Sequence, residues 1–536
     1  MAPVFRFARL PALAAALLLL GAGLSPSQAS DPTLVVTGNG AVRGVINNGL
    51  REFKGIPYAK PPSGELRFEL PQPAAAWTGT LDASAYKSAC PQAKRYGIPE
   101  SSSNEDCLTL NVTAPATEPE RKRAVIVWIH GGAFVGGSSA LYPLGHMATM
   151  GDVVMVSMNY RLGVFGFTAH PAFGADHNGG YGLEDQRLAL RWVKQNIAAF
   201  GGDPENITLA GESAGAASVC MHILAPDETS GLFHKAIVQS AGCVTPLPSV
   251  ADGNKIGEKV AAEVGCSDNA TALACLRGKT VDELLDAGAR VAGASIVTYM
   301  PVIGAKTVPL PGAQALPAGQ FVKVPMINGG TRDELRLYVA YAVQAGATIN
   351  ADTYAAQLQA VYGEHTDKVL EQYPASLYSS APTALGSVWS DFRADVGINN
   401  CIYLQTAKLL RKSVPVYAFV FGDPDAPPVT ADPGFEMGAV HSSELPYQFP
   451  HFDNTTALAG PDLKPASQAL ADKMVAYWTS FAKTGTPVAA GAPVWDAFTA
   501  ESKVMNLTPG QFGLFNAAEQ HHCAFWKALY PAILTE

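Results

Sequence analysis

The chain has 536 residues, of which 48% are hydrophobic and 15% are charged, so it can bury a sizeable core and is not a disordered chain. Its formal charge is −9, with 37 Lys and Arg against 46 Asp and Glu. No basic run is long enough to form a nucleic-acid-binding face, so no nucleic-acid partner is predicted.

The N-terminus has the pattern of an export signal. Basic residues precede the apolar run LPALAAALLLLGAGL at 10–24, and the tripeptide SQA follows at 27–29. Small residues flanking a polar one are typical of a signal-peptidase site. A membrane span needs about 20 apolar residues, which this run does not reach. We predict a cleaved signal peptide over 1–29, a secreted or periplasmic mature chain over 30–536, and no membrane span in that mature chain.

The first part of the mature chain, 33–59, has short β-prone runs separated by Gly and Asn, which are typical of antiparallel hairpins. Strand and helix patterns then alternate. Strands are expected at 123–132, 152–161, 206–211, 234–242, 324–334 and 414–423, and helices at 183–200 and 213–224. This alternation predicts an α/β fold with a mostly parallel central sheet and helices on both faces. Helical patterns at 250–320 and 350–415 predict an inserted helical subdomain.

Eight cysteines fit an oxidising compartment. By spacing, two pairs can each close a short loop, and a third can tie the C-terminal segment to the body: Cys90 with Cys107, Cys266 with Cys275, and Cys401 with Cys523. Cys220 and Cys243 remain, either as buried thiols or as a fourth bridge. No His/Cys cluster has zinc spacing, so no metal site is predicted.

The stretch TLAGESAGA at 208–216 places Ser213 between Gly211 and Gly215, after a strand pattern and before a helical one. The bare pattern G-x-S-x-G is weak, but in this context it is typical of a nucleophile raised on a strand–turn–helix. The two glycines let neighbouring backbone pass closely. We predict Ser213 as a nucleophile; the alternative is a glycine-rich turn with a passive serine.

A second motif, HGGAF at 130–134, follows the strand pattern RAVIVWI. Acyl transfer needs N–H groups aimed at the developing oxyanion. The small residues of this motif let backbone amides face a reacting carbonyl, and the amide of Ala214 at the helix start adds another donor. The alternative is an ordinary turn at the end of a strand.

At this point the chain resembles the type-B carboxylesterases, the cholinesterase-like α/β-hydrolases. Further blocks that carry the resemblance are FKGIPYAKPPSGELRF (53–68), EDCLTLNV (105–112), NYRLGVFGF (159–167), GTRDE (330–334) and GAVHSSELPYQF (438–449). The resemblance runs through nearly the whole mature chain. It implies one α/β-hydrolase domain over 30–536 that hydrolyses a small-molecule ester by serine catalysis and uses no cofactor.

A serine nucleophile needs a base, and the base needs an orienting carboxylate. Eleven histidines compete for the first role. The resemblance implies His441, in GAVHSSELPYQF, as the base and Glu334, the last residue of GTRDE, as the acid. Asp333 is then expected to make loop hydrogen bonds. Glu212 lies too close to the nucleophile in sequence to be the acid, and we expect it to stabilise the protonated base.

The resemblance also implies an oxyanion hole made by the amides of Gly132, Ala133 and Ala214, with Gly131 in a supporting role. It implies two buried ion pairs, Arg67 with Glu105 and Arg161 with Asp185. Its cysteine pattern implies the disulfides Cys90–Cys107, Cys266–Cys275 and Cys401–Cys523, which are the pairs suggested by spacing.

The loop at 91–106 bears on the substrate. In cholinesterases of this family the corresponding loop is longer and holds a tryptophan that faces the choline cation. Lipase-like members have a longer, apolar lid there. In this chain the loop is short and polar, with Tyr96 as its single aromatic residue. We therefore expect a small to medium soluble ester.

Two alternatives stay open. One is a narrow esterase that detoxifies a single xenobiotic or natural-product ester. The other is a non-catalytic adhesion or binding module of the same fold. The sequence gives no indication of the oligomeric state.

Overall fold

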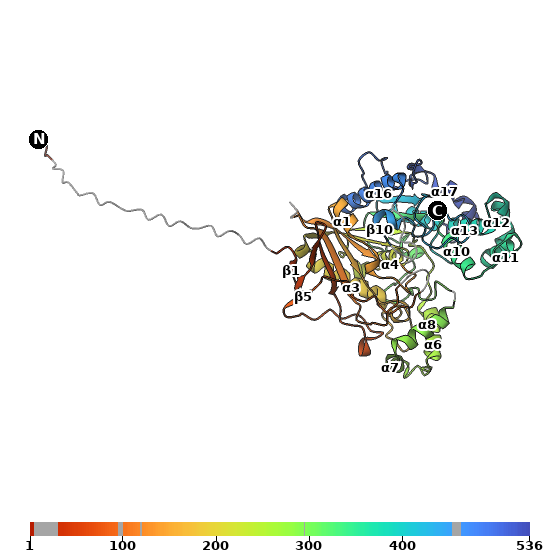
Figure 1. Ribbon diagram of the computed structural model, residues 1–536, viewed down its shortest axis with the longest axis horizontal. Coiled ribbons are helices and arrows are strands. Elements are labelled where there is room, and N and C mark those ends of the chain that lie inside the picture. Colours follow the sequence, from red (N-terminus) through yellow and green to blue (C-terminus); the bar gives the residue numbers. More distant parts are fainter. Residues whose placement is uncertain (5–30, 95–99, 118–120, 294, 453–462, 536) are drawn as a thin grey trace.

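A computed structural model of the protein describes residues 1–4, 31–94, 100–117, 121–293, 295–452 and 463–535 (Figure 1). The signal peptide predicted over 1–29 falls, apart from its first four residues, outside the described residues. Tyr96 also lies outside them.

A mixed sheet of 11 strands forms the centre of the described fold, in the order β14-β13-β12-β11-β10-β9-β7-β8-β6-β4-β3. Strands β8, β7, β9, β10, β11, β12 and β13 run parallel, whereas β14 at one end and β6, β4 and β3 at the other pair antiparallel. A second sheet has the order β1-β2-β5. The mostly parallel sheet and the N-terminal hairpins predicted from the sequence are confirmed.

The strands have the following bounds: β1 Leu34–Thr37, β2 Gly40–Arg43, β3 Val45–Asn47, β4 Leu50–Pro57, β5 Thr80–Asp82, β6 Thr109–Pro115, β7 Arg123–Ile129, β8 Val154–Met158, β9 Gly202–Glu212, β10 Lys235–Gln239, β11 Met326–Thr331, β12 Val416–Phe421, β13 Val504–Leu507 and β14 Gly513–Phe515.

Helices cover both faces of the large sheet, with α1 and α16 on one side and α3 and α4 on the other (Figure 1). The α-helices have the following bounds: α1 Gly145–Gly151, α2 Gly163–Gly166, α3 Tyr181–Asn196, α4 Ala214–Ile223, α5 Pro226–Thr229, α6 Val250–Glu263, α7 Ala272–Arg277, α8 Val281–Ala292, α9 Gly312–Ala315, α10 Arg336–Gln344, α11 Ala351–Tyr362, α12 Thr366–Gln372, α13 Ala381–Asp391, α14 Asn400–Leu410, α15 Leu445–Gln448, α16 Pro465–Thr484, α17 Ala517–Gln520 and α18 Cys523–Leu529.

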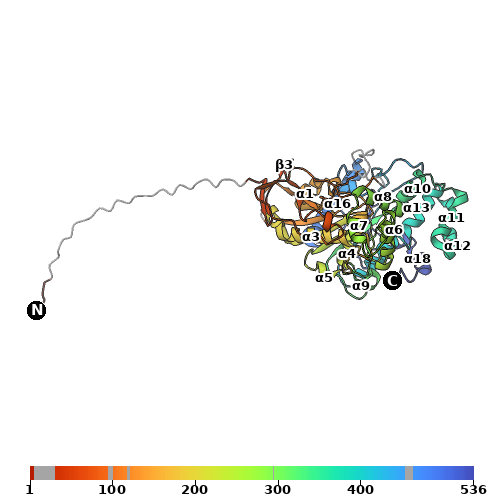
Figure 2. The same ribbon diagram turned by 90° about the horizontal axis from the view of Figure 1, so that it is seen from below.

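The predicted helical insertions form two groups. Helices α6, α7 and α8 lie together below the sheet in Figure 1, whereas α10, α11, α12 and α13 gather at the right end of the molecule in Figures 1 and 2. Helix α8 begins with a reciprocal capping box between Thr280 and Glu283. None of the helices in the described part of the chain combines the length and apolarity needed to cross a membrane.

Side chains of strand β7 pack alternately into two apolar clusters, one on each face of the large sheet. Val127 and Ile129 join the apolar cluster that contains residues of α3 and α4, while Ile126 and Trp128 join the cluster with α1 and α16. A parallel strand that is buried on both faces needs apolar side chains at successive positions. The continuous run RAVIVWI supplies them.

Four disulfides join all eight cysteines. Three are the predicted pairs, Cys90–Cys107, Cys266–Cys275 and Cys401–Cys523, which are confirmed. The fourth, Cys220–Cys243, answers the question that the sequence left open. Its two cysteines are fully buried, so it lies in the core rather than at the surface.

Both predicted ion pairs form. Arg67 Nη2 lies 2.6 Å from Glu105 Oε2, and Arg161 Nη2 lies 2.7 Å from Asp185 Oδ1. The second pair is almost completely buried, and Arg161 Nη1 also donates to the carbonyl oxygen of Glu69. Since each carboxylate oxygen of Asp185 accepts from the Arg161 side chain, the pair anchors the segment before α2 to α3.

Removing one member of this buried pair should destabilise the fold strongly, because the other charge is left without a partner. We expect Asp185→Ala to lower the free energy of unfolding by about 3–5 kcal/mol. As a control, Lys306→Ala breaks an exposed pair with Asp176 and should change stability little. Urea denaturation of both variants measures this; equal midpoints would contradict the anchoring role of Asp185.

Candidate active site

Ser213 lies at the turn between β9 and α4, as predicted. Its φ of 58° and ψ of −124° are strained for a residue with a side chain. The turn is tight because β9, α4 and β7 approach closely. A Cβ on Gly215 would lie 2.0 Å from the carbonyl oxygen of Ile129, and one on Gly211 would lie 2.5 Å from the carbonyl carbon of Gly215. Only glycine fits at these two positions, which explains the G-x-S-x-G spacing.

The structure brings the three predicted residues Ser213, His441 and Glu334 together. His441 Nε2 lies 2.8 Å from Ser213 Oγ, and His441 Nδ1 lies 2.7 Å from Glu334 Oε2. When Nδ1–H donates to Glu334, Nε2 is left to accept the serine proton. This is the geometry of a nucleophile, a base and an orienting acid.

Glu334 is held firmly in its position. Its side chain is fully buried, and its Oε1 accepts from the backbone amide of Thr331 and from the hydroxyl of Tyr403, each at 2.8 Å. Burial by itself raises the pKa of this carboxyl, but the attraction and hydrogen bond to His441, together with the hydrogen bond from the Thr331 amide, outweigh burial and lower the pKa. Glu334 is therefore ionised beside His441.

The acids next in sequence to Ser213 and Glu334, which are Glu212 and Asp333, have other positions and partners. Glu212 Oε1 is 3.3 Å from His441 Nε2, on the Ser213 side of the imidazole, and accepts from the hydroxyl of Ser442 at 2.8 Å. The nitrogen Nδ1 of His441 instead contacts Glu334. Asp333 accepts from the Ala439 amide at 3.0 Å, which is the expected loop hydrogen bond, and it also pairs with nearby arginines.

The imidazole of His441 is surrounded by carboxylates. Burial disfavours its charged form, but Glu212 and Glu334 outweigh burial and raise the pKa of His441 to about 9. A third acid, Glu444, was not predicted from the sequence, and its pKa is raised to about 8 by burial and by the other two carboxyls. The only sequence signal for Glu444 was its place three residues after His441, in the same block.

The predicted oxyanion loop has unusual backbone angles. Gly132, Ala133 and Phe134 have φ of 111°, 53° and 61°. Within the described chain, the N–H groups of Gly132 and Ala133 have no hydrogen-bond acceptor. Ala214 opens α4, so its N–H has no partner within the helix. All three predicted donors are therefore available to a substrate oxygen.

Gly131 differs from the three predicted donors because its amide already has an acceptor. Its amide donates to the hydroxyl of Tyr142 at 3.3 Å, so it is already used. A Cβ there would lie 3.0 Å from Glu212 Oε2 and 3.1 Å from Ser213 Cβ. A glycine at this position lets the loop 131–134 pass directly beside Ser213.

Two cavities meet at Ser213. The smaller one, about 50 Å³, is lined on the base side by residues that include Glu212, His441 and Ser442. The larger one, about 260 Å³, is mostly apolar and is lined by residues that include Ala214, Ala217, Met221, Ala241 and Gly242. Tyr338, four residues after Glu334, borders both cavities, a position that the sequence analysis did not predict.

No cluster of His, Cys, Asp and Glu side chains suited to holding a metal ion occurs among the described residues. The arrangement around Ser213 places a serine beside a base, and free backbone amides beside the serine. This set can attack a carbonyl carbon and stabilise the oxyanion that results.

Comparisons with known proteins agree with this geometry. Residues 31–526 match the model of the family described as the carboxylesterase family. The para-nitrobenzyl esterase of Bacillus subtilis (strain 168) is 33% identical over 91% of this chain and 96% of its own. The cocaine esterase of Homo sapiens is 32% identical over 99% of this chain and 97% of its own.

A solved structure of a thermophilic PNB esterase aligns with a TM-score of 0.78 and 30% identity, covering 92% of this chain and all of that one. The sheet with helices on both faces is therefore an α/β-hydrolase fold. The chain belongs to the carboxylesterase family, as its sequence motifs implied, and is a serine carboxylic ester hydrolase.

Proposed function

We propose that this enzyme hydrolyses small to medium neutral esters through Ser213, His441 and Glu334. The observation that carries the proposal is the unbroken chain of contacts from Ser213 Oγ through the two nitrogens of His441 to Glu334, at 2.8 and 2.7 Å. The disulfides also support export, because such bonds persist in oxidising compartments; they include Cys90–Cys107, Cys220–Cys243 and Cys401–Cys523.

The reaction has two halves. Ser213 Oγ attacks the ester carbonyl carbon while its proton passes to His441 Nε2, and the amides of Gly132, Ala133 and Ala214 receive the oxyanion. The bond from the carbonyl carbon to the alcohol oxygen then breaks, and that oxygen takes the proton from His441. Water repeats the sequence on the acyl-enzyme and releases the acid.

The path of the proton indicates which part of the ester occupies each of the two cavities. The leaving alcohol must lie beside His441, so it occupies the small cavity that contains this residue. The acyl group then extends into the apolar cavity of about 260 Å³. Asp395 is the charged side chain among the described residues that line that cavity, and Arg393 already pairs with it at 2.7 Å. An uncharged, apolar acyl group fits this lining best.

The first test is a panel of esters that vary in acyl and alcohol size, assayed with the wild-type enzyme and Ser213→Ala. We expect the variant to lose about 10⁶-fold in kcat on every ester, because the nucleophile is missing. Hydrolysis of one ester alone by the wild type would instead indicate the narrow esterase. Equal rates for both proteins would contradict the proposed mechanism.

The two carboxylates that touch His441 form a matched pair of variants. Glu334→Gln should reduce kcat by about 10⁴-fold, because the amide favours the wrong tautomer of His441. Glu212→Gln should reduce it only about tenfold, the effect of about one pKa unit of lost stabilisation. Steady-state kinetics on one ester compares them, and the reverse order of severity would mean that the two acids have exchanged roles.

The raised pKa of His441 predicts an alkaline pH profile. The base must be neutral to accept the serine proton, so kcat/KM should rise with pH and level off above about 9. Glu212→Gln removes one carboxylate that raises this pKa, and the rise should move to lower pH. Asp252→Asn, at an exposed site, serves as the control and should keep the wild-type profile. An unchanged midpoint in Glu212→Gln would contradict the electrostatic role of Glu212.

A further inference from the structure

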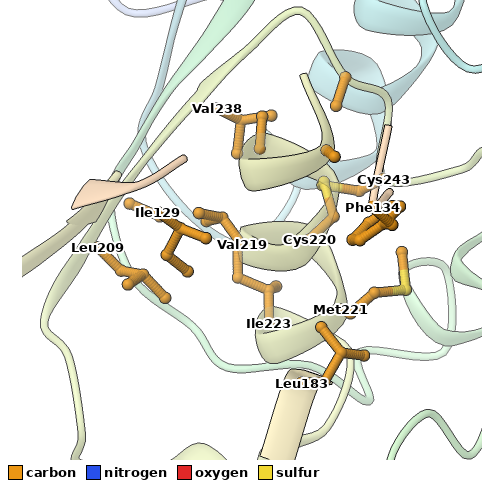
Figure 3. Packing of buried hydrophobic residues seen from close by; sticks show 14 of the residues in the cluster. Ile129, Phe134, Leu183, Leu209, Val219, Cys220, Met221, Ile223, Val238 and Cys243 are labelled. Atoms are coloured by element: carbon orange, nitrogen blue, oxygen red, sulfur yellow. A yellow bond between two sulfur atoms is a disulfide. The ribbon is translucent and has the colours of Figure 1, made fainter. Parts of the chain in front are cut away.

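The disulfide Cys220–Cys243 lies directly behind the apolar cavity. Cys220 belongs to α4, the helix that starts immediately after Ser213, and Cys243 follows β10. Both residues are buried, at 0% and 1% exposure. In Figure 3 the bond lies on the side of α4 that carries Met221 and faces Phe134, whereas Val219 points toward Ile129 and Leu209 of the sheet.

The bond joins two walls of that cavity. One wall is α4, which contributes Ala217 and Met221 on either side of Cys220. The other is the segment that contains Ala241, Gly242 and residues 245–248, with Cys243 inside it. The distance between these walls is therefore set by a covalent link.

The outer side of the second wall has no free space. A Cβ on Gly242 would lie 2.1 Å from Ile402 Cγ2, and one on Gly312 would lie 1.8 Å from the carbonyl oxygen of Cys243. These close contacts oppose movement of the segment toward Ile402 and Gly312. On its other side the segment borders the open space of the apolar cavity.

We propose that Cys220–Cys243 is a positioning element that keeps the acyl-side cavity open and thereby sets a preference for bulky apolar acyl groups. This inference rests on the proposed function, which assigns the acyl group to that cavity. An open apolar cavity loses the van der Waals contacts of its lining, so an unrestrained wall tends to close over it. A fixed wall avoids the free energy of reopening the cavity at each binding event.

The test removes the bond with Cys220→Ala/Cys243→Ala and compares 4-nitrophenyl acetate with 4-nitrophenyl octanoate, so that only the acyl group varies. We expect kcat/KM for the octanoate to fall about tenfold, mainly through a higher KM. A loss of about tenfold is typical when an apolar group fits a hydrophobic pocket less well. The acetyl group occupies little of the cavity, so kcat/KM for the acetate should stay close to the wild-type value.

Cys266→Ala/Cys275→Ala is the matched control. It removes a disulfide between the end of α6 and α7 that lines neither cavity, and the ratio of octanoate to acetate should stay at the wild-type value. If the double alanine variant does not fold, Cys220→Val/Cys243→Ala removes the same bond while refilling part of its volume, and the same ratio is measured on it.

The outcomes separate the two proposals. A lower octanoate-to-acetate ratio in the variants that lack Cys220–Cys243, with the control unchanged, supports the positioning role. An unchanged or higher ratio overturns it, while hydrolysis that still depends on Ser213 leaves the proposed function standing. Failure of the proposed function itself would be seen separately, as wild-type rates in Ser213→Ala.

Discussion

The close approach of α4 to β7 is the constraint on which the site depends. The backbone of Gly215 lies against the carbonyl oxygen of Ile129 with no room for a side chain. This contact sets the first turn of α4, and with it the amide of Ala214, beside the loop that follows β7 and carries Gly132 and Ala133. The proposed nucleophile and its three proposed amide donors thus follow two parallel neighbouring strands of one sheet, each at its carboxyl end.

The same edge of the sheet supplies the remaining groups. Glu334 follows β11 and His441 lies beyond β12, so their loops meet where β9 ends. Three buried carboxyls then surround one imidazole. In the proposed mechanism Glu334 orients the Nδ1–H of His441 and Glu212 acts from the side of Ser213, while Glu444 accepts a hydrogen bond from Gln239 at 3.1 Å. In that mechanism the positive charge that His441 gains is balanced by carboxylates that are already in place.

Local sequence patterns predicted the sheet and the turn at Ser213. The family resemblance implied both ion pairs, and it implied the three disulfides that cysteine spacing had also suggested. The strand before Ser213 begins at Gly202, earlier than the predicted 206, since Gly202 pairs with Arg123 of β7. Such a start depends on a partner strand, which periodicity does not reveal. The pairing of Cys220 with Cys243, the burial of Glu444 and the place of Tyr338 between two cavities depend likewise on contacts between distant segments.

The disulfide Cys401–Cys523 has a consequence for the integrity of the chain. It spans 122 residues, and His441 lies inside this covalent loop. A single break in the backbone between the two cysteines would leave both fragments linked through sulfur. A protease that cuts a surface loop of this region therefore does not release the segment that carries His441, and the sheet around it can keep the broken ends together.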